Sequence, residues 1–234
     1  MIVLGIETAT PQSSLALGDG ERILGALSLT AGRAQREAMI PGLEHLLRWT
    51  DIDIGRIGGV AVGIGPGLFT GLRVGVEVGK ALSQALRVPI VGLASLDVLA
   101  FQVHQARRLI AAAIDARRGE VFYALYRPVP GGAARESGFL IGSPDHLAAE
   151  LEARREEVLL VGNGAILYRK KFEQVGSRVE FASSAQAYPL ASALVELAVP
   201  RFLREEHDRL FDVVPLYLRK SDAEIAWDRR ARGA

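Results

Sequence analysis

The 234-residue sequence is long enough for one large domain or two small ones, and its 49% hydrophobic residues are ample for packed cores. The 28 basic and 27 acidic side chains leave a net charge of +1, which excludes a broad electrostatic surface for gripping nucleic acid unaided. Cysteine is absent, which excludes disulfides, thiolate nucleophiles and cysteine-ligated zinc. The apolar run of residues 2–6 is too short for a signal peptide or a membrane span, so we predict a cytoplasmic protein without membrane contact.

The first half of the chain alternates between strand and helix patterns. Apolar runs, with a Gly-Asp-Gly turn signal at residues 18–20, predict three strands at the start. Helical spacing of apolar residues then alternates with two further apolar runs. The predicted elements are strands 2–6, 14–17 and 22–29, helix 33–49, strand 58–64, helix 70–87 and a short strand from 89 to 92.

The second half repeats this order. After a helical linker at 95–107, the predicted elements are strands 109–114, 121–126 and 138–141, helix 144–154, strand 158–161 and helical segments up to about residue 205. Two βββαβα halves around a cleft are the plan of the actin, hexokinase and Hsp70 superfold. We therefore predict an α/β fold of the duplicated actin-like (ASKHA, ribonuclease H-like) class. Its expected parts are subdomain 1–94, subdomain 95–218, whose last helix packs back on the first subdomain, and a flexible tail at 219–234.

Each half carries a carboxylate directly after its first predicted strand, Glu7 in one and Asp115 in the other. Folds of this plan aim such acids at a nucleotide and its metal, although a polar residue can also simply end a strand. Thr8 and Ser13 belong to a segment that resembles the phosphate-contacting hairpin of actin-like ATPases. Glu7, Thr8, Ser13 and Asp115 are therefore a candidate nucleotide cleft.

Residues 63–73 are rich in glycine and join a predicted buried strand to a helix. The segment lacks the Gly-Lys-Ser/Thr ending of a P-loop, which favours a structural tight turn over a phosphate cradle. Along the following helix, apolar and small residues fill an arc of roughly 220°, whereas covering one sheet face needs little more than about 100°. The surplus predicts a second buried contact, which another chain could supply.

Small residues recur at every fourth position on both helices of the first half. They are Gly71, Gly75 and Gly79 in one helix and Ala34, Ala38 and Gly42 in the other. A glycine inside a helix costs about 1 kcal/mol relative to alanine, so a close approach of another element must offset it. We predict a helical interface with a partner; the alternative is that the two helices pack on each other within one subunit.

Groups suited to catalysis are sparse. A histidine-based metal site needs two imidazoles brought together, commonly at i and i+4 on a helix. The histidines are His45, His104, His146 and His207, and none is paired in this way. No G-x-S-x-G motif occurs, and a sugar kinase would need a catalytic base for which only Asp115 presents itself. The sequence therefore predicts no catalytic residue and no metal site.

Four segments together carry a family resemblance: residues 5–10 (GIETAT), 65–75 (GPGLFTGLRVG), 115–123 (DARRGEVFY) and 215–219 (PLYLR). They resemble the TsaB family of bacterial tRNA threonylcarbamoyladenosine biosynthesis proteins, the YeaZ-like, M22 glycoprotease-like paralogues of TsaD. The resemblance spans residues 1–220. The glycine-rich segment is the most diagnostic, and Leu68 departs from the serine that is usual there.

The resemblance implies a non-catalytic subunit of the machinery that threonylcarbamoylates N6 of adenosine 37 in tRNAs reading ANN codons. Members of the family are actin-like, form homodimers and pair through their first two helices with TsaD, the catalytic metalloenzyme. The ATPase TsaE joins the complex. TsaD holds its metal with an H-x-x-x-H motif on its first helix, and the matching residues 33–39 contain no histidine. We therefore expect no cofactor of the chain's own, ATP or ADP only in the complex, and tRNA contact only through the complex.

The small-residue helices and the family's pairing helices coincide, so we expect the partner surface there. Its predicted residues are Ala34, Ala38, Gly42, Leu46, Leu72, Gly75, Val76 and Gly79. The alternative functions are an M22-type metallopeptidase or an actin-fold phosphotransferase. A third hypothesis is direct tRNA binding by Arg117, Arg118 and the arginines of residues 229–232.

Overall fold

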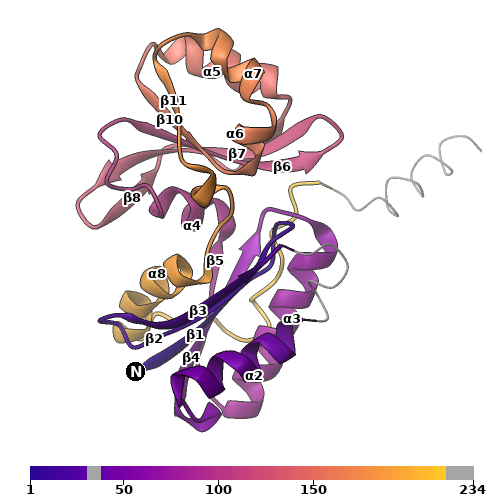
Figure 1. Ribbon diagram of the computed structural model, residues 1–234, viewed down its shortest axis with the longest axis vertical. Coiled ribbons are helices and arrows are strands. Elements are labelled where there is room, and N and C mark those ends of the chain that lie inside the picture. The colour runs from indigo at the N-terminus through magenta and orange to yellow at the C-terminus, as the bar shows by residue number, and fades with distance from the viewer. Residues whose placement is uncertain (31–37, 220–234) are drawn as a thin grey trace, which may run out of the picture.

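Two β-sheets organise the chain into two lobes (Figure 1). The computed structural model describes residues 1–30 and 38–219. The first lobe contains β1 (Ile2–Glu7), β2 (Ser13–Gly18), β3 (Ile23–Leu29), α2 (Met39–Thr50), a 3-10 helix (Ile54–Arg56), β4 (Ile57–Gly65), α3 (Phe69–Leu86) and β5 (Ile90–Ala94). Its strand order is β3-β2-β1-β4-β5, in which β1, β2 and β3 are antiparallel neighbours and β4 and β5 run parallel to β1.

The second lobe follows helix α4 (Ser95–Phe101). It contains β6 (Leu109–Arg117), β7 (Glu120–Val129), β8 (Gly132–Arg135), β9 (Leu140–Gly142), α5 (Pro144–Arg154), β10 (Val158–Val161), α6 (Asn163–Leu167), α7 (Arg169–Phe172), β11 (Val179–Phe181) and 3-10 helices at Glu173–Val175 and Ser184–Gln186. The strand order is β11-β10-β6-β7-β8, and β9 also pairs with β7. The chain then returns to the first lobe as α8 (Ala191–Leu203).

The two sheets share one topology, which confirms the predicted duplicated α/β order. In each lobe a central strand, β1 or β6, has an antiparallel neighbour on one side and two successive parallel strands on the other.

Three details differ from the prediction. The predicted strand 138–141 is present as β9, but a further strand, β8, precedes it on β7, and between the two the Leu125 N–H donates to the Ser137 hydroxyl (2.9 Å). Residues 179–181 form β11 where a helix was expected, because they pair with β10. The linker helix α4 ends at Phe101.

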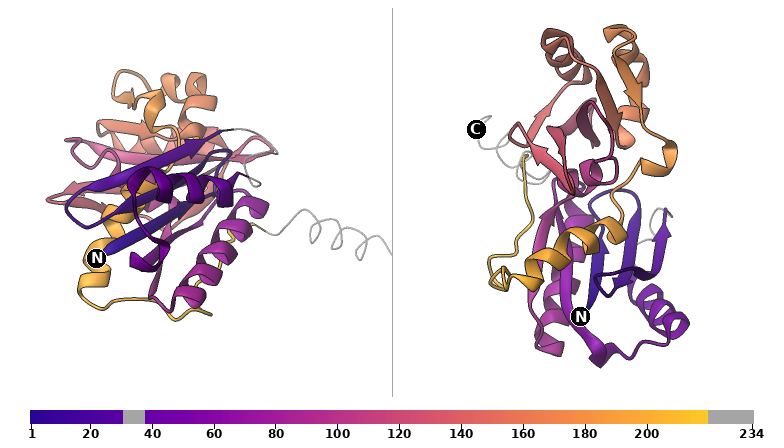
Figure 2. Two further views of the ribbon diagram at one scale, coloured as in Figure 1. Left: turned by 60° about the horizontal axis from the view of Figure 1, so that its bottom comes forward. Right: turned by 90° about the vertical axis from the view of Figure 1, so that its left-hand side faces the viewer.

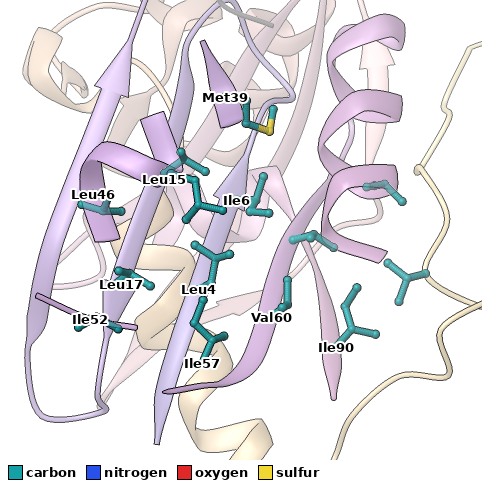
Figure 3. Packing of buried hydrophobic residues seen from close by; sticks show 14 residues of the cluster. Leu4, Ile6, Leu15, Leu17, Met39, Leu46, Ile52, Ile57, Val60 and Ile90 are labelled. Carbon is teal, nitrogen blue, oxygen red and sulfur yellow. The ribbon is translucent and has the colours of Figure 1, made fainter. Parts of the chain in front are cut away.

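The first sheet lies between two helical layers. Helices α2 and α3 cover one face, where Leu4 and Ile6 of β1 join the apolar side chains of both helices (Figure 3). Helix α8 covers the opposite face and packs against Val3. Successive residues of a strand point to opposite faces, so this alternation gives β1 a buried environment on both sides. Burial of one such leucine or isoleucine contributes about 1.5–3 kcal/mol.

Helix α4 lies between the lobes and packs on both. Val98 and Phe101 contact the apolar cluster around α8, whereas Leu96 and Leu99 belong to the core of the second lobe. Helices α5, α6 and α7 cover the other face of the second sheet. No helix in the described part of the chain combines the length and the apolarity needed to cross a bilayer. Apart from Arg219, the predicted tail lies outside the described residues.

Candidate functional site

Glu7 ends strand β1 inside the protein, with 0% of its surface exposed. Its Oε1 accepts a hydrogen bond from the Ala9 backbone N–H (2.7 Å), and its Oε2 accepts one from the Ser95 hydroxyl (2.8 Å). On the β4 side, a Cβ at Gly63 would overlap the carboxyl group, so only glycine fits. Burial disfavours the charged form and raises the pKa of Glu7 to about 7, although the hydrogen bonds oppose this shift.

Thr8 and Ser13, the next residues of the candidate cleft, are also packed within the first lobe. Thr8 is buried, and its hydroxyl donates to the Gly71 carbonyl (2.8 Å) in the first turn of α3. Ser13 is buried at the start of β2. The Thr8 hydroxyl bond to α3 and the Ser95 bond to Glu7 thus link the end of β1 to α3 and α4.

Asp115 occupies the equivalent position near the end of β6 in the second lobe. Its Oδ1 accepts a hydrogen bond from the Arg117 backbone N–H (2.9 Å), and the Arg117 guanidinium pairs with its carboxylate at 3.6 Å. Burial and the neighbouring Asp115 carboxylate raise the pKa of Tyr168. The Asp115 charge is therefore balanced within its own β6–β7 turn.

The nucleotide cleft therefore stays a prediction. Glu7 is bound to groups of the first lobe and of α4, and Asp115 pairs with Arg117 of its own turn, so each carboxylate has protein partners. In residues 1–30 and 38–219, no three His, Cys, Asp or Glu side chains gather as a possible metal site.

The glycines of α3 face the sheet of their own lobe. A Cβ at Gly71 would overlap the Thr8 carbonyl, one at Gly75 the Thr8 hydroxyl, and one at Gly79 a methyl of Val62. The glycine side of α3 therefore meets neither α2 nor a second chain. The close approach predicted from the glycine spacing is present. It lets α3 pack directly against β4 and the residue that follows β1.

Most of the predicted partner surface packs within the first lobe. Six of its residues are buried there: Gly42, Leu46, Leu72, Gly75, Val76 and Gly79. Ala38 is half-buried beside α2, and Ala34 lies outside the described residues. Ala38 and Gly42 also line an apolar groove beside α2, so these two of the predicted residues lie next to an open surface.

The outer side of α3 still carries apolar and small residues. Val74 and Val78 are half-buried, and Ala81 and Ala85 are exposed at the next positions along the same side. This stripe is the part of the predicted surplus arc that the sheet does not cover. The outer side of α3 therefore carries a strip of apolar and small side chains next to its charged residues.

An apolar groove lies between α2 and the β2–β3 hairpin, with a cavity volume of about 240 Å³. Its lining residues are Thr8, Ser13, Ser14, Leu15, Leu27, Leu29, Ala38, Met39, Pro41, Gly42, His45 and Trp49. Beside it, Leu29 and Trp49 expose 37% and 71% of their surfaces. We call Leu29, Trp49 and the groove the α2 face.

Ile40, which belongs to the apolar stripe that the sequence predicts, is 48% exposed. Trp49 lies on the same side of α2 as Ala38 and Gly42, so the signal that could have found it is a large aromatic residue on the small-residue side of the helix. Its ring contacts His45 edge-on at 5.5 Å.

His45, His104 and His146 each make a hydrogen bond on a different element. The His45 ring bonds to the Pro41 carbonyl (2.9 Å), His104 to the Phe101 carbonyl (2.6 Å), and His146 to the Tyr123 hydroxyl (3.3 Å). Each ring therefore serves a local contact on a different element. They do not form a shared site.

Comparisons with known proteins agree with this fold. The profile of the family described as TsaD, tRNA N6-adenosine threonylcarbamoyltransferase, matches residues 25–227. The Bacillus subtilis tRNA threonylcarbamoyladenosine biosynthesis protein TsaB is 29% identical over 97% of this chain and 98% of its own length. YeaZ from Pseudomonas aeruginosa superposes with a TM-score of 0.79 at 26% identity, over 93% of this chain and 99% of that one.

A more distant structure supports the fold alone. The activator of 2-hydroxyisocaproyl-CoA dehydratase from Clostridium difficile, solved with bound ADPNP, has a TM-score of 0.51 at 13% identity over 89% of this chain and 99% of that one. Together with the duplicated topology, these similarities confirm the actin-like class.

Proposed function

Because this chain belongs to the family of TsaD, tRNA N6-adenosine threonylcarbamoyltransferase, and is TsaB- and YeaZ-like, we propose that it serves threonylcarbamoyladenosine synthesis in tRNA. Its role in this proposal is that of a scaffold or activator subunit without catalytic chemistry of its own. The modified position is N6 of adenosine 37 in tRNAs that read ANN codons.

The state of Glu7 carries the non-catalytic part of the proposal. This is the position where the fold aims an acid at a nucleotide and its metal, and here both carboxyl oxygens accept hydrogen bonds from the protein. The group is also fully buried, and burial favours its neutral form. A sealed carboxyl group whose surroundings favour the neutral form is a poor metal ligand, because metal ligation needs the carboxylate.

We propose that the α2 face, together with the outer strip of α3, binds the catalytic paralogue TsaD. Exposed aromatic and aliphatic side chains beside an apolar groove are typical of the centre of a protein interface. In the proposal the same face joins two copies of this chain when the paralogue is absent. TsaE and tRNA, with ATP or ADP, join only the assembled complex.

A charged substitution on this face tests the proposal. Trp49→Asp should lower co-purification of the paralogue by about tenfold or more, because an interface anchor of this kind contributes more than about 1.4 kcal/mol. Since Trp49 is 71% exposed, the variant should keep the circular dichroism spectrum and melting temperature of the parent. The same variant should be monomeric by sedimentation if the homodimer uses this face.

The matched control is Leu167→Asp, which changes an apolar residue of α6 that is 59% exposed on the second lobe. It should leave co-purification unchanged. Equal recovery of the paralogue by the parent, by Trp49→Asp and by Leu167→Asp would refute this location of the interface.

A further inference from the structure

After α8, the chain runs along the first lobe and reaches the second (Figure 2). We call residues 208–219 the strap. Its start is joined to β5, where the Asp208 N–H donates to the Ile90 carbonyl (2.9 Å) and the Gly92 N–H donates to the Asp208 carboxylate (2.8 Å). Val213 is buried in the core between α3 and the first sheet, and the Leu216 N–H donates to the Ile64 carbonyl (2.7 Å).

Tyr217 makes the last contact of the strap with the first lobe. Its ring stacks on Phe69 of α3 with centroids 4.9 Å apart, and its hydroxyl accepts a hydrogen bond from Nε of Arg73 (2.9 Å). The Arg73 guanidinium also lies over the Phe69 ring at 4.0 Å. These three side chains fix the strap on the first turns of α3.

The next two residues hold the second lobe. Leu218 packs against the apolar core that β6 and β7 share with α4. The Arg219 guanidinium donates to the Glu120 carboxylate (2.7 Å) and to the Ala116 carbonyl (2.8 Å), on either side of the β6–β7 turn. Consecutive residues of the strap are therefore bound to different lobes.

The strap joins the lobes from a different side than α4. Helix α4 packs with α8 on one face of the first sheet, whereas Tyr217 lies on α3, which covers the other face. Attachments on both faces oppose a hinge rotation that either one alone would allow.

We propose that the strap is a clamp that holds the two lobes at a fixed separation, with the Arg219 contacts as its latch. Two-lobed proteins commonly close around a ligand by hinge motion. In this chain the clamp maintains one arrangement without a ligand, whether or not a partner is bound. Loss of the latch frees the lobes to separate while each keeps its own core.

A distance measurement between spin labels tests the clamp. The chain has no cysteine, so Arg56→Cys in the first lobe and Glu152→Cys in the second supply the only labelling sites, both at exposed positions. Labelled protein diluted with unlabelled chain reports distances within one molecule. In this background, Arg219→Ala should broaden the distance distribution and shift it to longer values.

Two further variants make the result decisive. Glu120→Gln weakens the latch from the second-lobe side and should broaden the distribution in the same way. Arg204→Ala removes an exposed arginine whose partner, Glu206, lies two residues away, and it should leave the distribution unchanged. If Arg219→Ala is not folded, Glu120→Gln decides alone. A distribution that superposes on that of the parent in the folded latch variants overturns the clamp.

Discussion

Glu7 is a carboxyl group that three elements enclose. Strand β1 carries it, Gly63 of β4 leaves it room, and Ser95 at the start of α4 donates to it across 88 residues of sequence. In water this group would ionise near 4.5, and burial moves the pKa of Glu7 to about 7. The protein therefore holds a proton here under conditions in which the unfolded chain releases it.

The raised pKa of Glu7 predicts a pH dependence of stability. Between pH 4.5 and about 7 the folded chain binds more protons than the unfolded chain, so the free energy of unfolding falls as the pH rises. The contribution of Glu7 is complete below pH 4.5 and is lost above about pH 7. Its size is about 3 kcal/mol, because one pKa unit corresponds to about 1.4 kcal/mol.

Glu7→Gln should remove this dependence, because the amide keeps the shape of the neutral acid. Urea unfolding at pH 5 and pH 8 should show that the variant loses less stability than the parent between the two, and that it is the more stable protein at pH 8. Glu152→Gln, at an exposed position of α5, is the control and should follow the parent. A steeper loss in Glu7→Gln than in the parent would contradict the buried neutral carboxyl.

The position of Glu7 at the end of a strand could be predicted from the sequence, but its burial could not. The pattern of one strand fixes where the acid lies along β1. Whether water or protein surrounds it depends on Gly63 and Ser95, which reach it only in the folded chain.

At the scale of elements, the helical pattern predicts the bounds of α3 and its close packing, but not the element against which it packs. Its bounds and those of β4 agree with the prediction, and so does the close approach at Gly71, Gly75 and Gly79. The spacing does not state which element approaches. The three glycines meet Thr8, directly after β1, and Val62 of β4, so the proposed partner surface uses exposed residues that the periodicity does not single out.

Gly75→Ala tests this packing. Alanine favours a helix by about 1 kcal/mol over glycine. Its methyl group would nevertheless overlap the Thr8 hydroxyl, which is held by its bond to Gly71. We expect a net destabilisation of about 1–3 kcal/mol in thermal or urea unfolding, since overpacking a core outweighs the propensity.

Gln84→Ala is the control for this substitution, because Gln84 is exposed on the same helix. It should change stability by no more than about 0.5 kcal/mol. A stabilised Gly75→Ala variant would show that α3 does not sit as close to β1 as the structure has it.

At the scale of the whole molecule, the duplicated order of strands and helices could be predicted because each half has its own periodic pattern. The short strands β8 and β11 depend on pairing with other strands, and three or four residues carry too little pattern to show it. The strap is even harder to predict from the sequence. It has no regular secondary structure, and its role follows only from side chains that bind Phe69 in one lobe and Glu120 in the other.

The sealed acid, the exposed α2 face and the family membership together support the proposal of a subunit that acts through contact with a catalytic partner. Reconstitution measures this most directly. The purified chain, the catalytic paralogue, TsaE, ATP and the small-molecule substrates are mixed with a tRNA that reads an ANN codon, and modified adenosine 37 is quantified by mass spectrometry. Modification should require both this chain and the paralogue, and Glu7→Gln should support it as well as the parent. Modification by this chain without the paralogue, or full modification when this chain is left out, would contradict the account.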